Sequence, residues 1–209
     1  GVRAGGRWRG RRRMKIDDIT VCYGTQTVLS HFSLCLPQSG VVALMGPSGV
    51  GKTTLLRVLM GLETPQSGTV ERPETPAYLF QEDRLLPWLT ALGNVEAVLP
   101  KGAKTQAAEA LRAMGLPAEA FAKRPEALSG GMRRRVALAR MVCFGGDVWL
   151  MDEAFKGLDT DSKHQVMDAL VRYAEGRLIV MVTHDEQDAR YMDAHIIRLT
   201  GPPLTVQRA

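Results

Sequence analysis

Cysteine is scarce in this sequence of 209 residues, which contains only Cys22, Cys35 and Cys143. The three lie far apart, and none forms a CxxC pair or has a histidine at metal-binding spacing. The pattern excludes a disulfide framework and a structural zinc site, and it predicts reduced, mostly buried thiols in a cytosolic protein. The sequence also lacks an apolar run approaching the ~20 residues needed to cross a bilayer, so we expect no membrane span.

An excess of positive charge is absent once the first 13 residues are set aside. Residues 1–13 contain six arginines and no acid, so the net charge of +5 becomes +5 − 6 = −1 for the remainder. This distribution argues against a nucleic-acid partner. Residues 1–13 are either a disordered basic arm or upstream sequence translated ahead of the true start at Met14. We favour the second interpretation, because nothing in the segment can pack and it lacks the apolar run of a signal peptide.

The strongest motif is GPSGVGKT at residues 46–53, which fits the GxxxxGK[ST] pattern in full. Apolar residues at 41–45 predict a buried strand before it, and leucines at 55, 56 and 59 predict a helix after it. The glycines would let backbone N–H groups surround the β- and γ-phosphates, while Lys52 adds positive charge and Thr53 offers a hydroxyl to Mg²⁺. The predicted nucleotide-binding residues are Gly46, Pro47, Ser48, Gly49, Val50, Gly51, Lys52, Thr53 and Thr54.

Two further apolar stretches end in polar residues. DVWLMDE, at residues 147–153, predicts a strand ending at Asp152 and Glu153. The carboxyl ends of parallel strands form the ligand crevice of such sheets, so Asp152 is placed to bind Mg²⁺ and Glu153 to orient or deprotonate water. A strand predicted at 178–182 is followed by His184, which would reach the γ-phosphate from the same edge. The pairing of Asp152 with Glu153 predicts nucleotide hydrolysis.

The stretch LSGGMRRRVALAR, residues 128–140, places two glycines between a serine and an arginine-rich helix. Ser129 can cap the helix, while Gly130 and Gly131 leave its first turn open to a ligand. Exposed amides and the positive end of the helix dipole would attract a phosphate. Taken alone, the pattern fits equally well an ordinary capped helix with a solvated basic face.

Together these motifs resemble the ATP-binding subunit of ABC transporters, from Met14 to about Leu199. The resemblance implies an α/β fold with a RecA-like phosphate-loop core and a small antiparallel β region in the early strands, at about residues 14–36. It also implies a single ATP-binding domain over residues 14–209, with a helical subdomain inserted at about 82–135. ATP and Mg²⁺ are the implied cofactors.

The resemblance assigns roles to further residues. LSGGM resembles the family signature, in which Ser129, Gly130 and Gly131 would cap the γ-phosphate of an ATP held by a second subunit. The aromatic that stacks on adenine, the glutamine that senses Mg²⁺ and water, and the loop that crosses the dimer interface are matched by Tyr23, Gln81 and Asp159. The implied catalytic residues are Glu153, His184 and Gln81, and the implied metal ligands are Thr53, Gln81 and Asp152. Two structural alternatives stay open, namely that Tyr23 packs across strands and that Asp159 caps a helix.

The chain departs from the usual family pattern at two positions. Ala154 stands where proline commonly follows the catalytic glutamate, and Arg134 stands where glutamine is frequent after the signature. Neither change removes a group that contacts the nucleotide. Loss of the proline would loosen the turn after Glu153 and so make the positioning of water less precise.

The segment RLLPWLTALGNV, residues 84–95, resembles the part of the family that lines a groove for a cytoplasmic helix of the transmembrane subunit. Trp88 and Leu86 are the candidate contacts, whereas core packing is the alternative for Leu85, Leu86 and Leu89. The sequence of this segment is similar to that of importers of nitrate, sulfonates, taurine and related small solutes.

These resemblances imply a homodimer at the cytoplasmic face of the membrane, bound to permease subunits and indirectly to a solute-binding protein. A soluble ABC-type ATPase acting on DNA, ribosomes or cell division is the alternative, and a phosphate-loop kinase would leave LSGGM unexplained.

Overall fold

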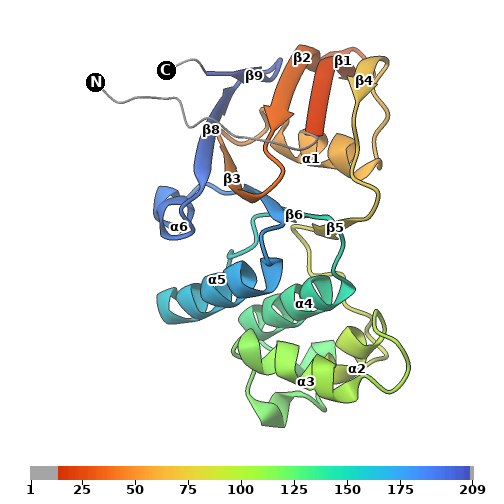
Figure 1. The fold of residues 1–209 in the computed structure, drawn as a ribbon, viewed down its shortest axis with the longest axis vertical. Helices are drawn as coiled ribbons and strands as arrows, with labels where there is room; N and C mark the ends of the chain where they lie inside the picture. The colour runs from red at the N-terminus through yellow and green to blue at the C-terminus, as the bar shows by residue number, and fades with distance from the viewer. Residues whose placement is uncertain (1–13, 208–209) are drawn as a thin grey trace.

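The first strands form a small antiparallel sheet in the computed structural model, which describes residues 14–207 (Figure 1). Its strand order is β2-β1-β4. The strands are β1 (Met14–Tyr23), β2 (Gln26–Leu36) and β4 (Ser67–Val70). Inward-facing residues such as Ile16 and Leu29 are fully buried, whereas many of their neighbours are exposed. This alternation is what a sheet with one solvent face requires, and it confirms the predicted antiparallel region.

A second sheet carries the site, with the strand order β5-β6-β7-β3-β8-β9. The first five strands are parallel to their neighbours, and β9 pairs antiparallel with β8. The strands are β3 (Gly40–Met45), β5 (Pro76–Leu79), β6 (Val148–Asp152), β7 (Leu178–Val182), β8 (His195–Thr200) and β9 (Thr205–Val206). Every residue of β6 and β7 is buried, because helices or the other sheet cover both faces.

Two apolar cores lie on the two faces of the parallel sheet. Val42 and Leu44 face the core shared with α1 (Lys52–Met60) and the antiparallel sheet. Ala43 and Met45 face the second core, which is shared with the remaining helices. The period of two along β3 therefore packs one helix between the two sheets and the other helices against the opposite face.

The remaining helices cover that opposite face and extend away from it. They are α2 (Ala91–Glu96), α3 (Lys104–Ala113), α4 (Gly130–Phe144), α5 (Thr160–Ala174) and α6 (Glu186–Tyr191). Figure 1 shows α2 and α3 at the end of the molecule farthest from β1 and β2, with α4 and α5 between them and the sheets. Short 3₁₀ turns at Ala118–Ala120 and Pro125–Ala127 connect α3 to α4. The limits of a helical subdomain at about 82–135 stay a prediction.

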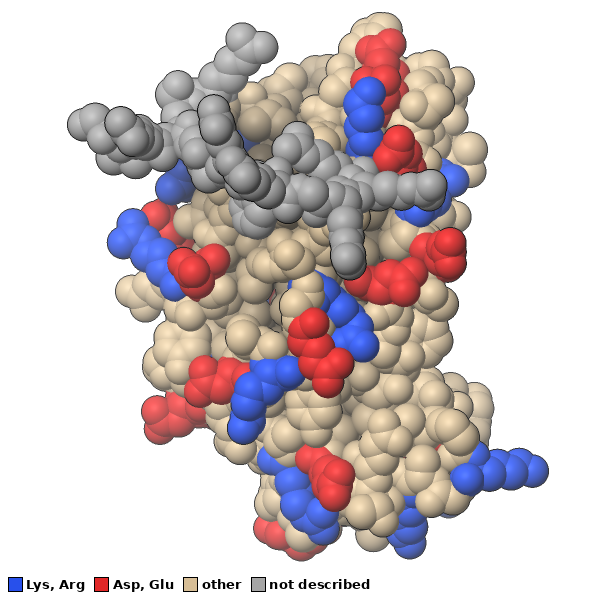
Figure 2. Space-filling view, viewed as in Figure 1, with Lys and Arg blue, Asp and Glu red and all other residues tan. Residues whose placement is uncertain are grey.

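Three other expectations can be compared with the fold. Cys35 is exposed and Cys22 and Cys143 are partly exposed, so the prediction of mostly buried thiols is wrong; Cys35 lies on the outward face of an edge strand. Within residues 14–207, no helix combines the length and apolar content needed to cross a membrane. The two interpretations of residues 1–13 lie outside the described residues. Figure 2 shows acidic and basic side chains interspersed on the visible face.

Candidate active site

The phosphate loop follows the end of β3, at the carboxyl edge of the parallel sheet. Gly46 packs so closely on the backbone carbonyl of Leu199 that a side chain has no room. Gly51 has φ 110°, and a Cβ there would lie 2.7 Å from Cγ1 of Val28. Both positions therefore require glycine, and their conformation lets the chain turn sharply into α1.

Lys52, the first residue of α1, is buried within this loop. Its Nζ donates to the carbonyl oxygens of Gly46 at 2.8 Å and Pro47 at 2.7 Å. Burial lowers the pKa of the lysine, while the carboxylates of Asp152 and Glu153 oppose that shift. The ammonium thus lies inside the curve of the loop, where the motif predicts a phosphate.

Thr53 and Asp152 meet although 99 positions separate them in the sequence. The threonine hydroxyl donates to Oδ2 of Asp152 at 2.8 Å. Asp152 is only 2% exposed, and burial raises its pKa, while the hydrogen bond from Thr53 opposes that rise. The predicted pair therefore exists, because β3 and β6 both end at the same edge of the sheet.

The chemistry of these oxygen donors fits Mg²⁺. Within residues 14–207, no group of three or more His, Cys, Asp or Glu side chains is arranged to hold a metal. Mg²⁺ needs no such cage in nucleotide enzymes, since one or two protein oxygens suffice when phosphates and waters complete its shell. One hydroxyl and one buried carboxylate, as in Thr53 and Asp152, are a donor set of that kind.

Glu153 receives three side chains at the same edge. Its Oε1 lies 3.2 Å from Nε2 of His184, and its Oε2 lies 3.3 Å from Nε2 of Gln81 and 3.1 Å from Nζ of Lys156. Burial raises the pKa of this carboxyl, but the contacts with Lys156 and His184 outweigh burial and leave the pKa lowered. The structure thus brings together the three residues predicted to be catalytic.

A cavity of about 480 Å³ opens beside these groups. Ser48 of the phosphate loop, Glu153 and His184 line it, together with Gly157 and Leu158 of the loop before α5. Ser129, Gly130 and Gly131 are not among its lining residues. The cavity therefore adjoins the phosphate loop at Ser48 and the catalytic residues at Glu153 and His184, but the signature residues do not line it.

The signature residues form the start of α4. Ser129 caps the helix by accepting from the Met132 amide at 3.2 Å, and both Ser129 and Gly130 are exposed. No contact in the described part of the chain tests whether they bind a nucleotide, so that role stays a prediction.

Two other predicted residues have structural partners. Asp159 caps α5 and accepts from the Ser162 amide at 2.9 Å, which is the structural alternative noted from the sequence. Tyr23 is 42% exposed, and its hydroxyl donates to Glu63 at 2.8 Å. Its ring is therefore accessible, and stacking on adenine stays a prediction.

Two residues of the site were missed from the sequence. Lys156 contacts Glu153, and Arg134 of α4 is buried beside the same turn. No local pattern singled out Lys156. Arg134, however, lies three and four positions before the buried residues Ala137 and Leu138, so helical periodicity places it on the buried face.

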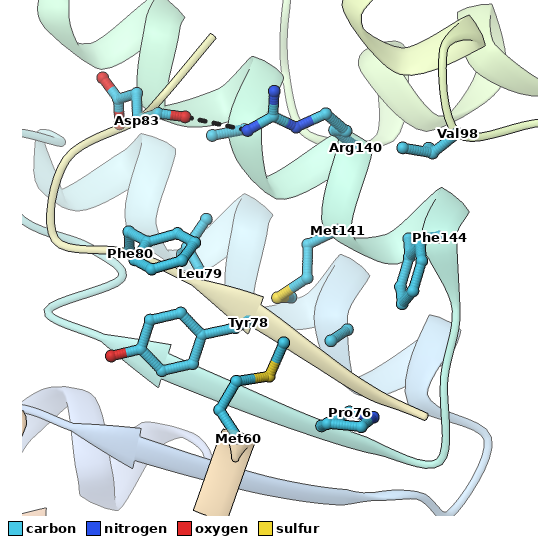
Figure 3. Close-up of a pocket in the computed structure, with 12 residues that line it drawn as sticks. Met60, Pro76, Tyr78, Leu79, Phe80, Asp83, Val98, Arg140, Met141 and Phe144 are labelled. Atoms are coloured by element: carbon cyan, nitrogen blue, oxygen red, sulfur yellow. Dashed lines mark hydrogen bonds between the residues drawn. The ribbon is translucent and has the colours of Figure 1, made fainter. Parts of the chain in front are cut away.

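A groove of about 200 Å³ lies between β5 and α4 (Figure 3). Tyr78, Phe80, Met141 and the half-exposed Phe144 line it, and the guanidinium of Arg140 donates to the carbonyl oxygen of Asp83 at 3.1 Å. Trp88 and Leu86, the predicted partner contacts, do not line this groove. Trp88 is nonetheless 66% exposed, and Leu86 is partly buried.

Comparison with known proteins agrees with this geometry. A family model described as ABC transporter matches residues 29–156. An uncharacterized ABC transporter ATP-binding protein of Haemophilus influenzae is 38% identical over 90% of this chain and 82% of its own length. The aliphatic sulfonates import ATP-binding protein SsuB 2 of Pseudomonas syringae pv. tomato is 37% identical over 88% of this chain and 81% of its own.

A solved structure is also similar. The dimeric structure of a post-hydrolysis state of the ATP-binding cassette MJ0796, bound to ADP and Pi, superposes with a TM-score of 0.80 at 29% identity. The match covers 88% of this chain and 93% of the other. The similarity therefore extends over most of this chain and nearly all of the related cassette.

Proposed function

Since the chain belongs to the ABC transporter family and is an ATP-hydrolysing subunit of it, we propose that two copies bind two ATP molecules between them to drive uptake of a small solute. The observation that carries this proposal is the convergence at one sheet edge. Thr53 contacts Asp152 there at 2.8 Å, and Glu153 contacts His184 at 3.2 Å. Because Asp152 and Glu153 are consecutive residues, the oxygen donors for a cation lie next to the carboxylate that would act as the base.

Each of these residues has a distinct task in hydrolysis. The N–H groups of the phosphate loop and the Nζ of Lys52 bind the β- and γ-phosphates. Glu153, with its lowered pKa, is ionised at neutral pH and accepts a proton from the attacking water. His184 and Gln81 contact the same carboxylate from two sides, so they orient Glu153 and that water toward the γ-phosphate.

Mg²⁺ would be held by Thr53 and Asp152, with Gln81 as the third predicted ligand, and when bound it would neutralise charge on the phosphate oxygens. Thr53 donates its hydroxyl hydrogen to Asp152, so the lone pairs of its oxygen stay available to bind the cation. Such a cation would stabilise the charged form of the buried Asp152 carboxylate and would offset the effect of burial on its pKa.

A dimer would complete this site, because the signature residues of the same chain do not line its cavity. The cavity beside Glu153 lacks the signature residues, while Ser129 and Gly130 are exposed at the start of α4. An ATP held by residues 46–53 of one copy would be covered by residues 129–131 of the other. ATP would therefore stabilise the closed dimer, and hydrolysis would remove the bridge and allow opening. The related cassette MJ0796 has a dimeric structure.

The permease subunits would bind at the groove between β5 and α4. Its lining combines apolar side chains with a rim arginine, Arg140, and the segment that carries Gln81 adjoins it. A short amphipathic helix fits such a groove, since its apolar face covers Met141 and Phe144. The subunit would then lie at the cytoplasmic face of the membrane. Aliphatic sulfonates or related solutes are the proposed cargo, in line with the sulfonate-import relative.

Replacing Glu153 with glutamine tests the site. We expect the variant to bind ATP, to lose at least 100-fold in hydrolysis rate and to dimerise with ATP in size-exclusion chromatography with light scattering. Glu175→Gln is the matched control, because Glu175 has the same φ of 49° but is exposed at the end of α5. Wild-type hydrolysis by Glu153→Gln, or an ATP-bound form that stays monomeric, would contradict the proposal.

A second experiment tests the membrane partner. Phe144→Asp places a charge in the groove and should abolish co-purification with multi-span subunits co-expressed from the same organism. Val171→Asp is the control, because Val171 is equally exposed (50% against 49%) but lies on α5, outside the groove. If no multi-span subunit co-purifies even with the wild type, a soluble ABC-type ATPase becomes the better reading.

A further inference from the structure

Arg134 is a buried cation of α4 that contacts the turn carrying Glu153. It is only 3% exposed. Its Nε donates to the carbonyl oxygen of Ala154 at 2.8 Å, and its Nη2 donates to those of Asp152 and Glu153, each at 2.8 Å. Three consecutive carbonyl oxygens therefore converge on one guanidinium.

The other side of the guanidinium contacts the segment after β5. Nη1 donates to the carbonyl oxygens of Phe80 at 2.7 Å and Gln81 at 3.4 Å, and to Oδ1 of Asp83 at 3.3 Å. An arginine has five N–H donors in a rigid planar fork, and all three of its nitrogens are used here. One side chain thus joins the turn at Glu153 to the segment that bears Gln81.

The turn itself needs such a partner. Glu153 has φ 49°, in the left-handed region that side chains other than glycine rarely adopt. A reversal of this kind points successive carbonyls toward one side, where their negative ends repel unless a donor group lies between them. Asp83 pairs with Arg134 and, with the carbonyl dipoles, makes burial of the charge tolerable, although burial still lowers the pKa of the arginine.

Other side chains could not replace these contacts. Glutamine, the residue frequent at this position in the family, offers two donors, and lysine offers three without the planar fork. The guanidinium also contacts the turn at the position that lacks the usual proline. Its Nε donates to the carbonyl oxygen of Ala154, the residue that replaces the proline. A backbone that proline would restrict through φ is here held by hydrogen bonds.

We propose that Arg134 is a positioning residue for ATP hydrolysis, which fixes the turn at Glu153 against residues 80–83 so that the carboxylate of Glu153 faces the amide of Gln81. The 3.3 Å contact between these two side chains is the distance that it maintains. The inference rests on the proposed role of Glu153. It adds that movement of the segment beside the groove reaches the hydrolytic carboxylate through this guanidinium, since Arg140 holds the same segment by the Asp83 carbonyl.

Steady-state ATP hydrolysis by Arg134→Gln, Arg134→Lys and the double variant Arg134→Gln/Ala154→Pro tests the inference. For Arg134→Gln we expect kcat to fall about 10- to 100-fold, as for a displaced catalytic group, with the KM for ATP within threefold and ATP-dependent dimerisation retained. Arg134→Lys should lie between the wild type and Arg134→Gln. The double variant should recover most of the lost kcat, because proline restricts the same turn.

The control is Arg177→Gln. Arg177 also donates to backbone carbonyls, those of Tyr173 and Ala174, but at the far end of α5, so its kcat should stay at the wild-type value. Arg134→Gln with kcat within twofold of the wild type overturns the inference. A lower kcat that comes with a raised KM for ATP and lost dimerisation also overturns it. So does a double variant no more active than Arg134→Gln.

The outcome separates this inference from the proposed function. If Glu153→Gln hydrolyses ATP normally, the proposed function fails whatever Arg134 does. If Glu153→Gln is inactive while Arg134→Gln is fully active, only the positioning role fails. Where Arg134→Gln does not fold, Arg134→Lys decides: a lower kcat at unchanged KM supports the role, and a wild-type kcat overturns it.

Discussion

Asn94 provides a direct test of how the segment at residues 84–90 is held against the helices. It is fully buried in α2. Its Oδ1 accepts from the Leu86 amide at 2.7 Å, and its Nδ2 donates to the carbonyl oxygens of Leu86, Leu89 and Thr90 at 3.1, 3.3 and 3.0 Å. One side chain therefore satisfies four backbone groups of a segment that has no regular secondary structure.

Replacing Asn94 with alanine should lower the free energy of unfolding by about 2–4 kcal/mol. Each of the four hydrogen bonds contributes about 0.5–1.5 kcal/mol net. The Leu86 amide and the Leu89 carbonyl lose a partner that water replaces only in part, whereas the carbonyls of Leu86 and Thr90 still accept from backbone amides. Asn94→Asp keeps the acceptor for Leu86 but turns a second oxygen toward three carbonyls, so it should cost at least as much. Affinity for ATP should not change, because none of these groups contacts the phosphate loop.

Urea unfolding followed by far-ultraviolet circular dichroism measures this loss. Gln106→Ala is the control, because Gln106 is an exposed side chain on α3 and its removal should cost less than about 0.5 kcal/mol. Limited trypsin digestion gives an independent readout, since release of the segment should speed cleavage after the exposed Arg84. A free-energy change for Asn94→Ala as small as that of the control, with unchanged cleavage, would refute the reasoning.

Three other changes have outcomes that the structure determines. Lys163→Met should lower the unfolding free energy by about 1–3 kcal/mol, measured by urea unfolding, because it leaves the buried carboxylate of Asp188 without its 3.2 Å partner. Iodoacetamide at pH 8 should modify the exposed Cys35 well before Cys143, whose pKa burial raises to about 11, and peptide mass spectrometry would detect the reverse order if this is wrong. Gly51→Ala should abolish binding of a fluorescent ATP analogue, because φ is 110° and the new Cβ would meet a valine of β2; normal affinity would show that the loop tolerates it.

The nucleotide half of the site could be predicted because its signals are local. The glycine spacing around Lys52 and the apolar runs that end at Asp152 and at His184 need only the rule that parallel strands share a carboxyl edge. The rule predicted that Thr53 and Asp152 would lie at one edge of the sheet, and the structure has them in contact across 99 positions. The fold class, by contrast, was implied by the family that these motifs resemble, and the parallel sheet with helices packed on it agrees with that class.

The supporting contacts could not be predicted, because they depend on packing between distant segments. Three arginines follow one another at 133–135, and periodicity indicates that the middle one faces inward, but nothing local identifies the carbonyls at Phe80 and Ala154 as its partners. Asn94 is likewise one polar residue in a helix, and its four bonds depend on the path of the chain before it. Every residue has a backbone carbonyl, so the sequence does not indicate which carbonyls a side chain will contact.

The two parts of the site differ in what holds them, and this difference predicts which kinetic constant each part controls. Asp152 ends the buried strand β6 and Thr53 lies in the first turn of α1, which packs on the same sheet, so these packed elements set their 2.8 Å contact. Glu153 lies one residue further, in a strained turn, and two of its partners are exposed, with Lys156 67% and His184 44% accessible. Displacing the Glu153 side chain disturbs mainly these exposed contacts, whereas displacing the sheet disturbs the cores packed on both of its faces. Substitutions that act on the turn should therefore change kcat, whereas substitutions in the phosphate loop should change binding and stability together.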